Sequence, residues 1–549
     1  MRTGLDLVIR NATVRTMDAA GTVADSLGIK GDRIVGVGQW SELAPFVDAR
    51  TRTVDAGGRA VFPGFIDGHT HFHKGAVARH LILNWNGGEN HPASIPAALE
   101  QLRDKAAGCA PGEWIRADGL NERRLPEQRL PTRWEIDRVA PDNPVVLVTT
   151  GNHAVVANSP ALAAAGIDRS TPDPPGGRLE RDETGDVTGV LRETAKLRLD
   201  NNRADNVIPK YEVADRMGPI TETIRAFHEI GITSIHDVMV DPLEIATWIR
   251  LHRQGELNIR VQMLIRGIET KTPLEHLVAL GLEDRLGDDW LRLGGVKLSV
   301  DGAYRGAAVY QAHPGEPDNF GLDRISAEEL ERAVRICHRN NLRLAVHVVG
   351  PRATDMTLDA FEKAFDGAPA AHMRHRLEHL ILPHTVAQLE RISRLGLIAS
   401  VQPRFISSLG DGWSDLWPTE ESRTGVMPFH ALSELGVPLM GGTDFNGDLY
   451  SPFEAMRASV TRLTPSGMAL DPAQALTVDQ AVRLQTTGAA FGGFDEQVKV
   501  SLEEGKLADV VIASQDPYRV DPTDLGDIQV EATIVGGQVV FDRSGLASS

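Results

Sequence analysis

Two histidines separated by one residue, His69 and His71, close an apolar stretch that begins at Val61. In a β-strand, alternate side chains point to the same side, so both imidazoles can reach one ion at the strand end. Ordinary polar histidines can show the same spacing. An imidazole that ends a buried strand, however, needs a polar partner. The pair therefore predicts metal binding.

Four more side chains that can bind a metal end other β-rich segments, namely Lys297, His347, His379 and Asp444. Each has an ordinary explanation, because a histidine can be structural, a lysine amine can extend to solvent and an aspartate can cap a helix. If the segments form one barrel, all six residues meet at one rim. Nitrogen and oxygen donors without cysteine suit Zn²⁺, with Mn²⁺, Fe²⁺ or Ni²⁺ as alternatives.

The segments that carry these residues alternate with helical patterns, which is typical of βα units. We predict eight strands, at about 61–67, 231–238, 259–265, 293–300, 342–348, 375–380, 397–402 and 437–444. Helices are expected between them, for example at 326–340 and 358–365. Eight such units predict an α/β fold, a closed (β/α)8 TIM-like barrel whose active site lies at the C-terminal ends of the strands.

Two regions do not fit the repeating βα pattern. Both chain ends are rich in short strands, so we expect residues 1–60 and 490–549 to form one small β-sandwich domain, with the barrel at 61–489 between them. Residues 75–205 are too long for a crossover between two strands. They contain β-rich runs at 114–117 and 144–149. We interpret them as an inserted subdomain near the barrel mouth that shapes substrate access.

The composition excludes several classes of partner. The chain has 549 residues and a formal net charge of −18, and no basic stripe that would favour nucleic acid or an anionic membrane. Its two cysteines, Cys109 and Cys337, predict neither a disulfide framework nor a thiolate zinc site. Without a signal peptide or a long apolar run, a cytoplasmic location is expected.

Several motifs combine in an order typical of one family. They occupy residues 62–71, 158–162, 295–298, 301–302, 347, 378–379, 400–403, 442–444 and 505–509. Together they resemble the amidohydrolase superfamily, and within it the amidohydrolase-3 group that includes the YtcJ-like proteins and the N-substituted formamide deformylases. The resemblance covers almost the whole chain and is specific for the family, but weak for a substrate.

The resemblance implies roles for the six residues. His69 and His71 would hold one metal together with Asp444, and His347 and His379 a second. Lys297 would be carboxylated by CO₂ to a bridging carbamate, which would remove the penalty of a buried amine. Some members of the superfamily use one metal and no carbamate, so one or two ions remain open. A homodimer is also implied only by the resemblance.

The chain departs from the family pattern after the fourth barrel strand, where Tyr304 and Arg305 replace other residues. We expect both to contact substrate. His153 is shifted by one position relative to a family histidine, and Gln402 follows the seventh strand. These two are further candidates for substrate binding.

The expected reaction is hydrolysis of a non-peptide carbon–nitrogen bond in a small molecule: an amide, formamide, urea, carbamate or cyclic amide. A metal-activated hydroxide would attack, with Asp444 as general base. Two alternatives stay open: a ring deaminase that uses the same metal site, and a non-catalytic metal-binding scaffold. The pocket loops set the substrate, which the sequence does not name.

Overall fold

The computed structural model describes residues 4–85, 91–150, 154–175, 177–199, 206–267, 274–366 and 369–546. Two compact units make up the chain. The larger contains residues 1–72, 221–445 and 449–549, and the smaller contains residues 73–220 and 446–448. The smaller unit thus interrupts the larger one after its first histidine pair.

The larger unit contains an eight-stranded parallel sheet whose strands follow one another in chain order. They are β8 (Phe65–Thr70), β15 (Ile232–Val240), β16 (Arg260–Arg266), β17 (Leu291–Ser299), β18 (Leu344–Val348), β19 (Arg376–His379), β20 (Ile398–Val401) and β21 (Leu439–Gly441). Backbone hydrogen bonds from the segment after β21 reach β8, including Asp444 N to His69 O at 2.7 Å. The first and last strands therefore meet, which confirms the predicted TIM-like barrel.

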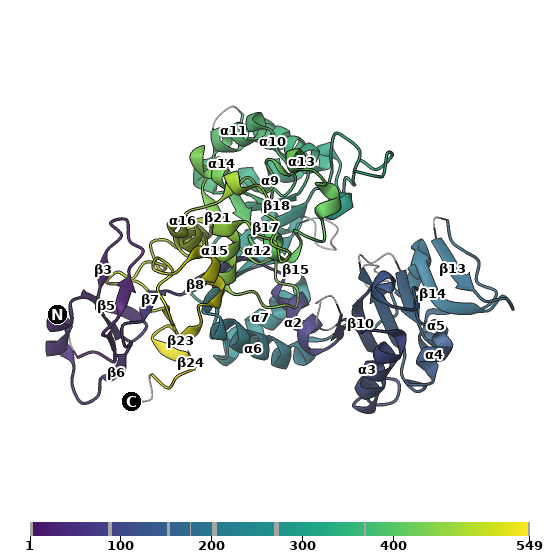
Figure 1. The fold of residues 1–549 in the computed structure, drawn as a ribbon, viewed down its shortest axis with the longest axis horizontal. Helices are drawn as coiled ribbons and strands as arrows, with labels where there is room; N and C mark the ends of the chain where they lie inside the picture. Colours follow the sequence, from purple (N-terminus) through teal and green to yellow (C-terminus); the bar gives the residue numbers. More distant parts are fainter. Residues whose placement is uncertain are drawn as a thin grey trace. The chain divides into compact units, whose positions relative to one another are not determined.

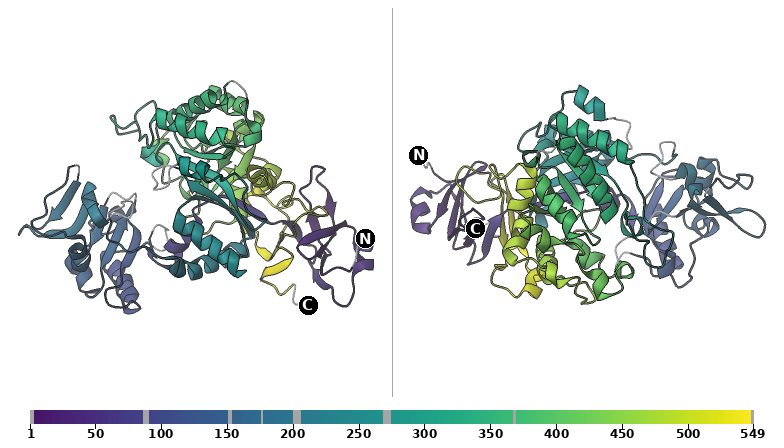
Figure 2. Two further views of the ribbon diagram at one scale, coloured as in Figure 1. Left: turned by 180° about the vertical axis from the view of Figure 1, so that it is seen from behind. Right: turned by 90° about the horizontal axis from the view of Figure 1, so that it is seen from above.

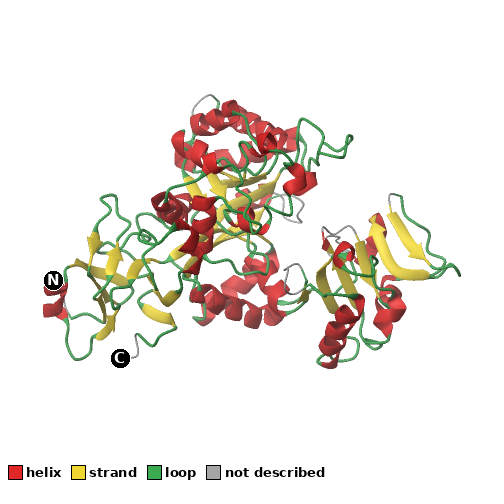
Figure 3. Ribbon diagram, in the orientation of Figure 1, coloured by secondary structure: helices red, strands yellow, loops and turns green. Residues whose placement is uncertain are grey.

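Helices pack outside these strands, as Figures 1 and 3 show. They are α6 (Val213–Glu229), α7 (Pro242–Gln254), α8 (Leu274–Ala279), α9 (Ala327–Arg339), α10 (Pro351–Phe365), α11 (Val386–Leu395), α12 (Arg404–Ser408), α13 (Glu420–Arg423), α14 (Phe429–Glu434), α15 (Pro452–Thr461), α16 (Val478–Leu484) and α17 (Thr487–Gly493). The start of α9 illustrates why they form where they do. Ser326 and Glu329 make a capping box there, and the apolar face of α9 is buried in the core.

Strands from both chain ends lie side by side, as the purple and yellow segments of Figure 2 show. One sheet contains β5 (Arg33–Gly38), β4 (Ser26–Lys30), β1 (Leu7–Arg10) and β6 (Arg52–Asp55). The other contains β24 (Gln538–Asp542), β23 (Val530–Val535), β22 (Val510–Ala513), β7 (Ala60–Pro63), β2 (Thr13–Arg15) and β3 (Val23–Ala24). One apolar cluster joins side chains from both ends, including Leu27 and Ile534.

The strand predicted at 61–67 is divided in the structure. Ala60–Pro63 pairs antiparallel with β22 in the terminal sheet, and Phe65–Thr70 belongs to the barrel. Gly64 stands between them, where a Cβ atom would collide with the side chain of Thr233. Only glycine fits this close approach at the point where the chain passes from the terminal sheet into the barrel.

The smaller unit has its own six-stranded sheet. Its order is β13 (Gly177–Arg181), β14 (Val187–Glu193), β12 (Ala154–Ala157), β11 (Val145–Thr149), β10 (Ile115–Leu120) and β9 (Leu83–Asn84). Its helices include α2 (Phe72–His80), which begins in the larger unit, α3 (Ile95–Ala107), α4 (Arg133–Asp137) and α5 (Ser159–Ala165). Within the described ranges, no helix is long and apolar enough to cross a membrane.

Candidate metal centre

Three predicted donors lie together where the barrel closes. His69 is near the end of β8, His71 follows that strand, and Asp444 follows β21. The Asp444 Oδ1 atom is 3.5 Å from His69 Nε2 and 3.3 Å from His71 Nε2. One donor atom from each residue lies within 4.8 Å of the other two. We call these residues the first triad.

The other three predicted donors come from neighbouring strands. Lys297 belongs to β17, His347 to β18 and His379 to β19. The His347 and His379 rings are 4.5 Å apart between centroids, and His379 is 4.9 Å from the His69 ring. We call these residues the second triad. All three line one cavity of about 190 Å³ together with His71 and Asp444.

Buried polar side chains hold two of the imidazoles. His69 Nδ1 is 2.5 Å from the Glu378 carboxylate, which in turn forms an ion pair with Arg376, with 2.6 Å between the carboxylate oxygen and Nε. His379 Nδ1 donates to the Gln402 side-chain oxygen at 2.7 Å. An acceptor at Nδ1 keeps the proton there and leaves the Nε2 lone pair available, as metal-binding histidines require.

A second buried carboxylate, that of Asp67, connects the two sides of the barrel seam, by which we mean the junction between β8 and the segment after β21. Asp67 accepts hydrogen bonds from the His69 amide at 3.2 Å, the Thr443 amide at 2.8 Å and the Thr443 hydroxyl. Burial raises the pKa of Asp67 to about 6. The backbone is also constrained, because His379 and Asp444 have φ angles of 82° and 54°. Such φ values are uncommon outside glycine and persist only where the surroundings fix them.

The surroundings of these side chains favour their deprotonated forms. Burial lowers the pKa of Lys297 to about 8, and burial with the charges of His379 and Lys297 holds the pKa of His347 well below its ordinary value. Burial alone would raise the pKa of Asp444, but the imidazoles of His69 and His71 hold it well below normal. Neutral imidazoles and a carboxylate are the forms that bind a cation.

The donor set fits a metal ion. Among the six predicted donors, four buried atoms have no hydrogen-bond partner in the described chain: His69 Nε2, Lys297 Nζ, His347 Nε2 and Asp444 Oδ1. Buried polar atoms normally have partners. A divalent cation would satisfy the imidazole and carboxylate atoms directly. These buried atoms therefore need a group that the protein itself does not supply.

The candidate substrate contacts have different surroundings. The Tyr304 hydroxyl donates to Asp415 at 2.5 Å, and Arg305 pairs with the same carboxylate at 2.7 Å. Neither residue is among those that line the 190 Å³ cavity. Gln402 is bound to His379, so its amide oxygen is already used. His153 lies outside the described residues.

Sequence reasoning assigned no role to Arg376 or Glu378, although both are fully buried beside His69. A signal was present, because two charged residues at positions i and i+2 of an apolar strand share one face. That is the same spacing that identified His69 and His71. Sequence reasoning also did not single out Arg324, which lines the 190 Å³ cavity.

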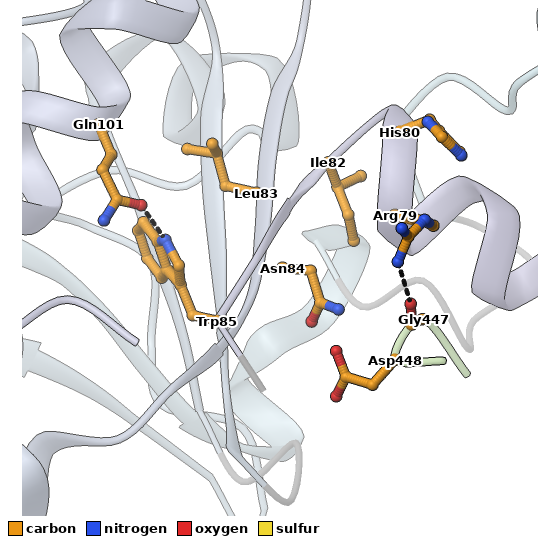
Figure 4. Close-up of a pocket in the computed structure, with 9 residues that line it drawn as sticks. All are labelled: Arg79, His80, Ile82, Leu83, Asn84, Trp85, Gln101, Gly447 and Asp448. Atoms are coloured by element: carbon orange, nitrogen blue, oxygen red, sulfur yellow. Dashed lines mark hydrogen bonds between the residues drawn. The ribbon is translucent and has the colours of Figure 1, made fainter. Parts of the chain in front are cut away.

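A second cavity, of about 560 Å³, lies within the smaller unit (Figure 4). Its walls include Trp85, which donates to Gln101 at 2.6 Å, and Arg79, which donates to the Gly447 carbonyl at 3.5 Å. None of the predicted site residues lines it. Within the described ranges, the three-donor cluster that fits a metal is the first triad.

Comparisons with known proteins agree with this picture. The profile of the amidohydrolase family matches residues 52–541. An N-substituted formamide deformylase from Arthrobacter pascens is 30% identical over 98% of this chain and 99% of its own. YtcJ of Bacillus subtilis strain 168, assigned to the amidohydrolases, is 26% identical over 97% of this chain and 98% of its own. The crystal structure of an uncharacterised metal-dependent hydrolase from Pyrococcus furiosus is 25% identical, covers 93% of this chain and 100% of its own, and has a TM-score of 0.74.

Proposed function

Since this chain belongs to the amidohydrolase family, we propose that it is a metal-dependent hydrolase of a non-peptide carbon–nitrogen bond. The supporting observation is the meeting of His69, His71 and Asp444 at the C-terminal end of the barrel. That is the place where barrels of this kind carry their active sites. The formamide deformylase relative makes N-substituted formamides the first substrates to test.

In this proposal the first triad holds one divalent cation, with Zn²⁺ the expected ion and Mn²⁺, Fe²⁺ or Ni²⁺ as alternatives. The second triad holds another if Lys297 carries a CO₂-derived carbamate. Burial lowers the pKa of Lys297 to about 8, and this supports the carbamate, because a neutral amine is the form that reacts with CO₂. When bound, the metal would acidify water and polarise the substrate carbonyl.

Asp444 moves the proton. Its pKa lies well below normal, so it is a carboxylate at neutral pH and can accept a proton from the attacking water. The same oxygen then delivers that proton to the leaving nitrogen. Glu378 holds His69 through Nδ1 and Gln402 holds His379 in the same way, so the imidazoles keep their orientation during the reaction.

The proposal is tested with purified protein, metal analysis and a panel of formamides, amides, ureas, carbamates and cyclic amides. We expect release of amine from at least one class, loss of turnover after chelation and recovery on adding Zn²⁺. Ammonia release from ring amidines alone would favour the deaminase. Bound metal without turnover on the whole panel would favour the non-catalytic scaffold.

A further inference from the structure

Arg324 differs from the other side chains that line the metal cavity. The cavity is lined by candidate metal donors and by Met239, Ser299, Asp301, Gly302, Ala303 and Arg324. Apart from Lys297, which belongs to the second triad, Arg324 is the cationic member of this lining. It lies in the segment between β17 and α9, and its side chain is exposed.

The backbone of Arg324 has a defined position at the end of β17. Its amide donates to the Val300 carbonyl at 2.8 Å. The preceding residue, Asp323, forms an isolated antiparallel bridge with Asp301. The arginine side chain therefore starts from a point fixed to the strand that carries Lys297.

The acids beside Arg324 are already engaged. Asp323 pairs with Arg352 at 2.7 Å. The Asp301 carboxylate accepts hydrogen bonds from three backbone amides at 2.9 to 3.0 Å. In the part of the chain that the structure describes, the Arg324 guanidinium forms no ion pair or hydrogen bond with another side chain. An anion in the cavity would therefore meet an available arginine.

The geometry points to Arg324 as a binding residue for a substrate carboxylate, an inference that rests on the proposed hydrolase function. A guanidinium binds a carboxylate through two parallel hydrogen bonds, so it selects both charge and orientation. The cavity of about 190 Å³ is smaller than a typical ligand pocket of roughly 300 Å³ or more. The carboxylate must therefore lie within a few bonds of the scissile amide, as in N-acyl and N-carbamoyl derivatives of small amino acids.

Paired substrates of equal shape test this inference. N-formylglycine carries a carboxylate where N-isobutylformamide carries an isopropyl group of similar shape. N-acetylglycine and N-isobutylacetamide differ in the same way. We expect kcat/KM to favour the acidic member of each pair. Arg324→Gln should raise KM for the acidic member about 10- to 100-fold and leave KM for the neutral member unchanged. Arg324→Lys should restore part of the preference for the acidic member.

Arg339→Gln is the matched control, because Arg339 is exposed at the end of α9 and does not line the cavity. It should change neither substrate. An Arg324→Gln variant that loses activity equally on both members, or that keeps the acidic preference, overturns the inference.

A binding measurement separates this inference from the proposed function. Levulinate is the ketone analogue of N-acetylglycine and has no amide to cleave, and 5-methylhexan-2-one is its neutral counterpart. If the metal-loaded protein hydrolyses neither these four amides nor any other member of the panel, but binds levulinate about 10-fold more weakly after Arg324→Gln, the hydrolase fails and the carboxylate site stands. Equal levulinate affinity in both proteins overturns the carboxylate site.

Discussion

The first triad has its donor atoms close to one another, with Asp444 Oδ1 3.3 to 3.5 Å from two imidazole nitrogens. In the second triad, the ring centroids of His347 and His379 are 4.5 Å apart, but the third member is the amine of Lys297 rather than a carboxylate. The chain itself therefore builds one candidate metal position. The second position depends on the chemical state of Lys297, since a protonated amine repels a cation and a carbamate attracts one.

This difference has a structural origin. The first triad joins the first and last barrel strands, and Asp67 fastens both sides through His69 and Thr443. The second triad lies on three successive strands, β17, β18 and β19, so the parallel pairing of neighbouring strands alone brings its side chains together. Barrel closure thus assembles the first triad, and a bound group completes the second.

Removing the carboxylate of the first triad should have the largest effect. Asp444→Asn keeps the shape but weakens proton transfer, so we expect kcat to fall by about 10²- to 10⁴-fold. Circular dichroism and thermal unfolding should remain close to those of the native protein. A variant with full turnover would remove Asp444 from the mechanism.

Changing Lys297 tests the second triad directly. Lys297→Met keeps the volume of the buried chain but removes the nitrogen, so metal analysis should find no more than one ion per chain. If the native protein holds two, the loss of charge stabilisation should reduce kcat/KM less than Asp444→Asn does. Equal metal content in both proteins would show that Lys297 binds no second ion. Mass spectrometry and ¹³C-bicarbonate labelling would detect the carbamate.

The supporting residues Glu378 and Gln402 allow the two triads to be weakened separately. Glu378→Gln replaces the carboxylate at His69 by a neutral amide, and Gln402→Leu removes the acceptor at His379. Each should weaken metal affinity about 10- to 100-fold. Chelator competition and the visible spectrum of the Co²⁺ form measure this without turnover.

The two variants should differ in which ion is lost first. Glu378→Gln also removes the carboxylate that pairs with Arg376, so the free energy of unfolding of this variant must be measured together with its metal affinity. If both variants lose the same ion first, and with the same decrease in metal affinity, the two triads do not act as separate sites.

The smallest expected effect separates acid damage to the metal centre from acid unfolding. Burial lowers the pKa of His228, in α6, to about 4. Below its ordinary pKa of 6.5 the unfolded chain takes up a proton that the folded chain does not accept until about pH 4. Stability should therefore fall as the pH drops through this range, by up to about 3 kcal/mol from this residue.

His228→Gln should flatten the pH dependence of the free energy of unfolding between pH 6.5 and 4. Urea unfolding at several pH values measures this. Metal content should fall with pH at the same rate in both proteins, because His228 is not a donor. An unchanged slope would mean that other groups dominate acid unfolding.

Much of this arrangement was predictable from periodicity. Apolar strands between helical segments predicted the barrel, and the residue types at the strand ends singled out six candidate donors that the structure brings to one rim. The division at Gly64 was not, because it depends on the approach of Thr233, which is distant in sequence. The same limit applies to Tyr304 and Arg305, whose partner Asp415 follows more than a hundred residues later.

The barrel seam has a consequence for biosynthesis. His69 emerges from the ribosome early, but Asp444, its partner across the seam, comes after every other barrel strand. A nascent chain can therefore fold most of its sheet while Asp444, the proposed proton acceptor, is still missing. Since the contact that closes the barrel is the same contact that completes the first triad, a truncated or partly folded chain should be catalytically silent.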